Sequence, residues 1–387
     1  MWNEARTACP AWPRQAIAIP DRRRRSRFGQ NLASLPGTLS ADLDEWLGWC
    51  AVPDPLDANA RHRRLAPRTI ALRREQVLAA VNAALDEGIP ADRLTSLADL
   101  VEIDVFKAIL MRLHRNAGGK PNAHAQGVSL TLVSLAQEWA KIPPEHLREL
   151  KRLRARLPAL PKGLVAKNRA LLRRFEDPAL VHRLLELPGV IWREAVSRKP
   201  FTHKAMVKAQ LAIALAIQLT VPLRPRNLYA LSFERHIHEP AGPAGPLLIS
   251  IPPEETKTGI RIEAEISGDL AVWLRRYRDR LVPSLTGRRP DLIFARPDGV
   301  LKHTTTLATQ LRRIIRKRLG IAMSAHQFRH LAAKLSLDAN PACFEAVRQL
   351  LGHSSLRSTT NAYAGIDTRR AGRAYSKLIE ELRDRIK

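Results

Sequence analysis

The residues most suited to chemistry begin in a helical stretch that carries two histidines and an arginine. His326 and Arg329 are three residues apart, so on a helix they project from the same side. An arginine can bind two nonbridging oxygens of one phosphate, and a histidine can take or return a proton near neutral pH. A tyrosine, Tyr363, follows in a turn-rich stretch. Together these groups could break a phosphodiester bond without a metal ion.

Tyr363 is the candidate nucleophile. An isolated tyrosine is most often a structural or surface residue, and a phenol, with a pKa of about 10, needs a proton acceptor and nearby positive charge before it attacks. Tyr363 does not stand alone, because it lies ten residues after His353, which closes the motif Leu-Leu-Gly-His. The box His-Gln-Phe-Arg-His lies upstream of both, at residues 326–330. This context favours the nucleophilic role.

A metal site and a plain surface helix are the alternatives for the same box. His326 and His330 have the spacing of a metal-binding pair on a helix, but no acidic residue lies between them as it does in HExxH sites. We therefore expect no metal and no other cofactor, and we interpret His330 as an inward structural histidine. A solvated helix face remains the alternative for His326 and Arg329.

In this order the boxes resemble the active site of the tyrosine recombinase (phage integrase) family. The family's first arginine box usually reads Gly-Leu-Arg-x-x-Glu-Leu, and residues 222–228 read Pro-Leu-Arg-Pro-Arg-Asn-Leu. Arg224 matches the family arginine, with Arg226 as its neighbouring alternative. Asn227 replaces the acidic residue, so it can accept a hydrogen bond but brings no negative charge.

The resemblance also assigns a lysine and a second histidine. Lys257 lies in a turn between two expected strands, where the family places a lysine that protonates the departing 5′-oxygen; an exposed turn lysine is the alternative. His353 matches a His/Trp position that hydrogen-bonds a phosphate oxygen. The predicted catalytic residues are Arg224, Lys257, His326, Arg329, His353 and Tyr363.

The elements that must position these residues are expected to be mostly helical. Residues 247–251 and 260–266 have short β-type character and predict a hairpin around the Lys257–Gly259 turn, and the chain from Leu270 onward is almost entirely helical in pattern. We therefore predict a mainly α fold with a small β-sheet, an α+β catalytic domain over residues 200–387.

Three further segments precede the predicted catalytic domain. Residues 1–60 form a Pro- and Arg-rich basic arm with one short helix. Residues 61–157 show helical periodicity, and this helical domain resembles the DNA-binding core-binding domain of the recombinases. Residues 158–199 are expected to be connector helices. A C-terminal tail helix over residues 371–386 would pack either on its own domain or on a neighbouring protomer.

Composition limits the class of partner. The chain has 387 residues, a net charge of +27 and a pI near 11.1, which favours a polyanion such as duplex DNA or RNA over a membrane surface. Its three cysteines lack CxxC spacing, so neither a disulfide framework nor a zinc ribbon is expected. With no bilayer-length apolar stretch and no export signal, we expect a cytoplasmic protein that is nucleoid-associated when bound to DNA.

Two basic helices are candidate contacts to the DNA backbone, although a solvated face is the alternative for each. Their basic residues are Arg148, Lys151, Arg152, Arg312, Arg313, Arg316 and Lys317. His236 and His238 alternate as residues of a strand do, and we expect them at the surface rather than as ligands.

The resemblance implies a site-specific DNA recombinase that joins a strand to the tyrosine as a 3′-phosphotyrosine and needs neither metal nor ATP. It implies double-stranded DNA as the partner and a homotetramer on that DNA, and it leaves room for accessory proteins. A non-catalytic, sequence-specific DNA-binding regulator derived from a recombinase is the alternative. A metal nuclease is disfavoured because the sequence shows no clustered carboxylates.

Overall fold

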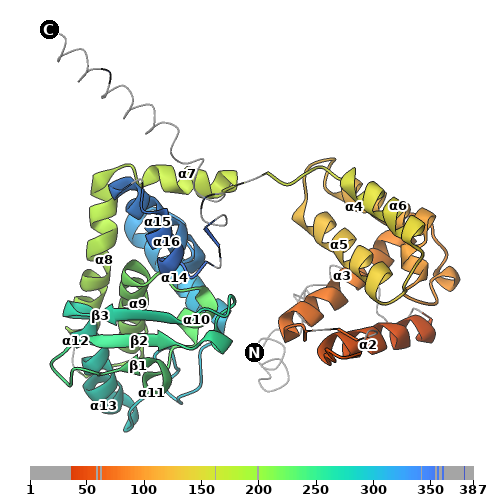
Figure 1. Cartoon of the computed structure of the whole chain (residues 1–387). Helices are drawn as coiled ribbons and strands as arrows, with labels where there is room; N and C mark the ends of the chain where they lie inside the picture. Colours follow the sequence, from red (N-terminus) through yellow and green to blue (C-terminus); the bar gives the residue numbers. More distant parts are fainter. Residues whose placement is uncertain are drawn as a thin grey trace, which may run out of the picture. The chain divides into compact units, whose positions relative to one another are not determined.

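The computed structural model describes residues 36–57, 60–61, 63–161, 163–197, 200–340, 342–353, 355–356, 360 and 379. Tyr363, most of the expected basic arm and nearly all of the expected tail helix lie outside the described residues. The chain divides into two compact units, with the boundary after Pro161 (Figure 1).

The first unit is helical. Short 3₁₀ turns, η2 (Ala91–Arg93) and η3 (Asp99–Val101), separate its longer helices, and Trp46, Phe106 and Leu132 are fully buried in its core. The longer helices are α2 (Gly37–Ala51), α3 (Pro67–Asp86), α4 (Ile103–Asn116), α5 (Ala123–Glu138) and α6 (Pro144–Ala155).

The second unit surrounds a small sheet with helices (Figure 1). Its first helices are α7 (Ala166–Arg174), α8 (Pro178–Val196), α9 (His203–Thr220), α10 (Pro225–Tyr229) and α11 (Phe233–His236). The strands β1 (Ile237–His238), β2 (Leu247–Ile251) and β3 (Ile262–Ile266) follow, with η4 (Pro253–Glu255) between the last two. The remaining helices are α12 (Gly268–Arg276), η5 (Tyr277–Leu281), α13 (Val282–Thr286), α14 (Thr304–Leu319), α15 (Ala325–Ala339) and α16 (Phe344–Leu350).

The sheet is antiparallel with the strand order β1-β2-β3. In the β2–β3 hairpin Leu247 pairs with Ile266 and Ile251 pairs with Ile262, so the connection between the strands runs through Lys257. Every second residue of β3 is more exposed, as expected for a strand with one face on the core. The predicted hairpin and the mainly α fold with a small sheet are confirmed.

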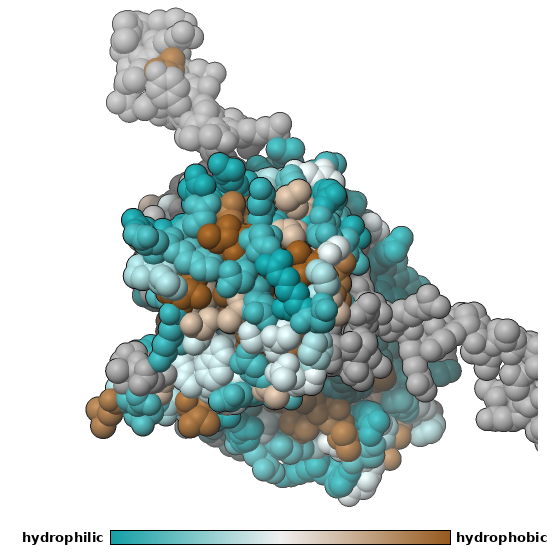
Figure 2. All heavy atoms as spheres, turned by 90° about the vertical axis from the view of Figure 1, so that its right-hand side faces the viewer, coloured by the Kyte–Doolittle hydropathy of each residue, from teal (hydrophilic) through white to brown (hydrophobic). Residues whose placement is uncertain are grey.

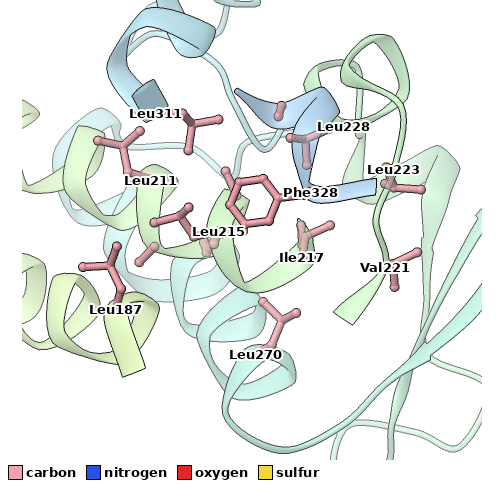
Figure 3. Close-up of a cluster of buried hydrophobic side chains, with 14 of the residues drawn as sticks. Leu187, Leu211, Leu215, Ile217, Val221, Leu223, Leu228, Leu270, Leu311 and Phe328 are labelled. Atoms are coloured by element: carbon pink, nitrogen blue, oxygen red, sulfur yellow. The ribbon is translucent and has the colours of Figure 1, made fainter. Parts of the chain in front are cut away.

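Helix α9 lies in the centre of the second unit's core and is apolar on nearly every side. Figure 3 shows Phe328 of α15 among Leu215 and Ile217 of α9 and Leu228 of α10. Helices α7 and α8, which we expected to be connectors, belong to this core, because α8 packs along α9 and Trp192 is buried there. The arginine box therefore follows directly after a helix that is buried in the core of the unit.

Two glutamines, Gln210 and Gln218, are buried within that apolar helix, and Gln210 lies in a polar network. The Gln210 amide donates to the Tyr277 hydroxyl and to the Ala295 carbonyl, each at 2.7 Å, and its oxygen accepts from the Lys302 ammonium. Burial lowers the pKa of Lys302 to about 8. Gln210, Tyr277 and Lys302 thus satisfy one another's polar groups in the interior.

The surface is mixed. On the face in Figure 2 hydrophilic residues dominate, and hydrophobic ones occur in small separate groups. Leu185 and Val272 are among the large hydrophobic residues that are exposed. None of the described helices has the length and apolar character that crossing a membrane requires. Cys50 and Cys343 are free thiols.

Candidate active site

Arg329 is fixed at the first turns of α15. A capping box starts the helix, because the Gln327 side chain accepts a hydrogen bond from the Ser324 amide at 2.8 Å. The Arg329 side chain is only 4% exposed; it donates to the Pro222 carbonyl at 2.7 Å and to the Leu351 carbonyl. One guanidinium thus joins the arginine box to the end of α16.

Arg224 lies directly before α10, whose first residue is Pro225. Its Nη2 donates to the Gly352 carbonyl at 3.2 Å. Its Nη1 is buried and has no hydrogen-bond partner among the described residues. Burial also lowers the pKa of this guanidinium. A buried donor without an acceptor is costly, and an oxygen acceptor at this nitrogen would remove that cost.

Gly352 is the point where the arginine box meets the hairpin. Its φ of +54° is a left-handed conformation that glycine adopts at little cost. Its carbonyl accepts from Arg224 and also from the Thr258 hydroxyl, at 3.0 Å. His353 follows at once and is held through its backbone, since its amide donates to the Arg348 carbonyl at 3.0 Å and its carbonyl accepts from the Arg348 guanidinium at 2.8 Å.

Lys257 is exposed in the connection between β2 and β3. Thr258 attaches one side of this connection to Gly352, and the Asn227 amide donates to the Glu255 carbonyl at 3.0 Å on the other. The lysine is therefore carried by a turn that is anchored on both sides.

We call Arg224, Lys257, His326, Arg329 and His353 the Arg–His cluster. Burial of part of the His326 ring lowers its pKa, and the charges of Arg329, Arg224 and Lys257 lower it further. Burial and neighbouring cationic groups likewise bring the pKa of His353 to about 4. The groups are thus close enough for their charges to interact, and the histidines are neutral at pH 7. A neutral His326 can accept a proton.

His330 packs beside the cluster. Its ring meets that of His326 edge to face, with the ring centres 4.9 Å apart. Burial lowers the pKa of His330 to about 4, with further contributions from His326, Arg329 and His353. Among the described residues, no three His, Cys, Asp or Glu side chains lie together as a metal ion would require.

Residues 201–370 match the model of the phage integrase family. The chain carries a phage integrase domain. Comparison with curated proteins found no match. Among solved structures, a lambda integrase dimer bound to a COC′ core site is similar at 16% identity and a TM-score of 0.47, over 84% of this chain and 94% of that one. XerH site-specific recombinase bound to difH substrate is similar at 19% identity and a TM-score of 0.48, over 80% and 79%.

The phage integrase domain brings five of the six predicted catalytic residues together, and the sixth, Tyr363, lies outside the described residues. Sequence reasoning missed Thr258, although it is the neighbour of Lys257 and has a hydroxyl. It was also wrong about His236, which is 2% exposed rather than on the surface. Two alternating histidines suggested an exposed strand edge, but His236 ends α11 and turns inward.

The predicted DNA contacts divide into two kinds. On α6, Arg148 and Arg152 pair with Glu145 and Glu149 of the same helix, at 3.2 and 2.7 Å, and the Lys151 ammonium lies 3.4 Å from the Gln137 side-chain oxygen. On α14 of the phage integrase domain, the basic side chains are exposed; they are Arg312, Arg313, Arg316 and Lys317. Whether either set meets DNA stays a prediction.

Proposed function

We propose that this protein is a tyrosine-type site-specific DNA recombinase, which cuts and rejoins DNA strands through a 3′-phosphotyrosine intermediate. The observation that carries the proposal is the charge balance of the Arg–His cluster. The neighbouring charges that shift the pKa of His326 and His353 are all positive, and Arg224 holds a buried donor that lacks an acceptor. A phosphodiester supplies both the missing negative charge and the missing acceptor.

The same groups suit the transition state. As phosphorus becomes five-coordinate, negative charge gathers on its nonbridging oxygens, and donors fixed before the reaction stabilise that charge most effectively. Arg224, Arg329 and His353 take this role. Arg329 is already held in one plane by two backbone carbonyls, so little conformational freedom remains to be lost when the phosphate binds.

The remaining groups move protons. Tyr363 attacks phosphorus as its hydroxyl proton passes to neutral His326, forming the bond between the phenolic oxygen and phosphorus. The bond from phosphorus to the 5′-oxygen breaks, and Lys257 gives that oxygen a proton, so a free 5′-hydroxyl leaves. Attack by a different 5′-hydroxyl reverses the step and yields a recombined strand, without ATP.

Duplex DNA is the proposed partner. A net charge of +27 and the exposed basic face of α14 match its phosphates. Exchange between two duplexes needs four cleavages, which implies four copies of the chain on DNA. The non-catalytic regulator is the competing function, and nothing in the Arg–His cluster favours it.

The test is a suicide duplex with a nick beside the cleavage position, made from a recombination junction that is sequenced at the encoding locus. Wild-type protein in EDTA is expected to form a covalent protein–DNA band that resists denaturation. Tyr363→Phe is expected to shift the duplex equally well in a gel but to give no covalent band. Equal shifts with no covalent band from either protein would support the regulator instead.

A further inference from the structure

A buried histidine lies beneath the turn that carries Lys257. The His236 side chain is 2% exposed, and its Nδ1 accepts a hydrogen bond from the Ser232 amide at 3.0 Å. A ring nitrogen that accepts a hydrogen bond holds no proton, so the proton of the neutral ring lies on Nε2. That nitrogen is 3.1 Å from a carboxylate oxygen of Glu255 and donates to it.

Burial lowers the pKa of His236, and the charge of Arg235 lowers it further. The hydrogen bond from Ser232 agrees with this direction, because an imidazolium could not accept it. His236 is therefore a neutral ring in a fixed tautomer, with one nitrogen committed to the backbone and the other to Glu255.

Glu255 is where three segments meet, two residues before Lys257. Its side chain accepts from His236 and pairs with Arg235, both at the end of α11. Its main-chain carbonyl accepts from Asn227 of α10, three residues after Arg224. Asn227, the residue that replaces the acidic residue of the arginine box, thus holds the main chain of Glu255, whose carboxylate is bound by α11.

We infer, on the basis of the proposed function, that Glu255, held by His236 and Asn227, is a positioning residue that sets Lys257 against the 5′-oxygen of the cleaved bond. The geometry supports an indirect role, because the Glu255 carboxylate is committed to His236 and Arg235. What it controls is the start of the short segment that carries the lysine. A misplacement of the lysine by about 1 Å can cost about 100-fold in rate.

A positioning role can be separated from a purely structural one by changing the leaving group. If sulfur replaces the bridging 5′-oxygen, the departing thiolate needs no proton donor, because a thiol has a pKa of only about 8.5. A defect confined to the placement of Lys257 should then disappear. A general loss of structure, or a loss of charge stabilisation at the nonbridging oxygens, should remain.

The experiment compares single-turnover cleavage of the ordinary duplex and of the 5′-phosphorothiolate duplex by the full-length protein. We expect Glu255→Ala to slow the ordinary substrate by about 10- to 100-fold and the sulfur substrate by less than about threefold. Glu255→Gln, which can still accept from His236, should lie between wild type and Glu255→Ala. Glu254→Ala, a change at the exposed neighbouring glutamate, is the matched control and should behave as wild type.

Two further variants keep the outcome interpretable. Lys257→Ala should also be rescued by sulfur; if it is not, the lysine is not the proton donor and the inference fails with that assignment. Arg329→Lys should stay slow on both substrates. Equal slowing of both substrates by Glu255→Ala, or no slowing of either, would overturn the positioning role while leaving the recombinase proposal intact. A wild-type protein that cleaves neither substrate would instead overturn the proposed function.

Discussion

The arginines of α6 and those of the Arg–His cluster differ in what they bind. Arg148 and Arg152 of α6 pair with carboxylates three residues away on their own helix. Arg224 and Arg329 of the second unit donate to main-chain carbonyls. The charges of the α6 arginines are therefore offset by carboxylates of their own helix, whereas Arg224 and Arg329 are oriented by main-chain carbonyls.

The difference shows that a count of cationic residues does not separate arginines offset by carboxylates from arginines oriented by carbonyls. An exposed intrahelical ion pair contributes a few tenths of a kcal/mol to stability and cancels most of the field of each partner. A carbonyl is a dipole without net charge, so it can fix a guanidinium and still leave the full positive charge for a substrate. The partner of an arginine is the more informative observation.

Among the arginines of the two regions, the largest effect is expected at Arg329. Replacing it with lysine keeps the charge but removes the planar fork that joins the Pro222 and Leu351 carbonyls. Cleavage should fall by about 100- to 1,000-fold, with duplex affinity within about threefold of wild type. Covalent-complex formation and gel shift measure the two quantities. Unchanged cleavage would contradict the clamp role and, with it, the contrast between the two regions.

The dependence of stability on pH should reflect the burial of His330 and, after it, the charges of its neighbours. The folded pKa of His330 is about 4, against about 6.5 in an unfolded chain. Between these values the unfolded chain binds more protons, so the contribution of His330 to stability is complete above about pH 6.5 and is lost as pH falls toward 4.

Replacing His330 with glutamine should therefore reduce, by about 1–3 kcal/mol, the free energy of unfolding that the protein loses over that pH range. Tm measured from pH 7 to 4.5 for both proteins gives the comparison, because carboxylates common to the two proteins cancel in the difference. Parallel curves would show that the histidine does not titrate as its surroundings require.

A smaller effect is expected at Thr258. Replacing it with valine keeps the shape but removes the hydroxyl that bonds the Gly352 carbonyl, a loss of about 1 kcal/mol. Cleavage should fall by about fivefold, whereas Thr258→Ser, which keeps the hydroxyl, should stay near wild type. Valine at the wild-type rate, or serine as slow as valine, would contradict the role of this hydrogen bond.

The smallest expected effect is on the affinity for duplex DNA, where an arginine of α14 is compared with one of α6. Arg316→Gln on the exposed face of α14 should weaken duplex binding by a fewfold and reduce the slope of log affinity against log salt by about 1. Arg152→Gln on α6 should leave the slope unchanged, because its charge is already offset by Glu149. If Arg152→Gln changes the salt slope more than Arg316→Gln does, the Arg152–Glu149 ion pair opens on DNA. An intrahelical carboxylate would then not prevent an arginine from binding DNA.

The features that could be predicted from the sequence are those that depend on the type and spacing of side chains. The spacing of His326 and Arg329, the hairpin and the apolar helix before Arg224 all follow from periodicity and motif, and the structure agrees with the predicted hairpin and mainly α fold. Their partners could not be predicted, because the carbonyls of Leu351 and Gly352 are main-chain atoms that any residue type would supply.

His236 shows a second limit of sequence reasoning. Its burial depends on how a four-residue helix turns into a two-residue strand, and such short elements have no periodicity to detect. The role of Tyr363, the DNA contacts and the four-part domain division remain predictions.

The hydrogen bonds of Gln210 favour one orientation of α9 about its helix axis. Because α9 is apolar on nearly every side, hydrophobic burial alone would tolerate several orientations about its axis. A rotation of α9 by one residue, about 100°, would move the Gln210 amide away from the Tyr277 hydroxyl and the Lys302 ammonium. These buried groups would then lack the hydrogen bonds that offset the cost of their burial. Since α9 ends at Thr220, four residues before Arg224, the rotation of this helix also affects the direction in which the arginine box leaves the core.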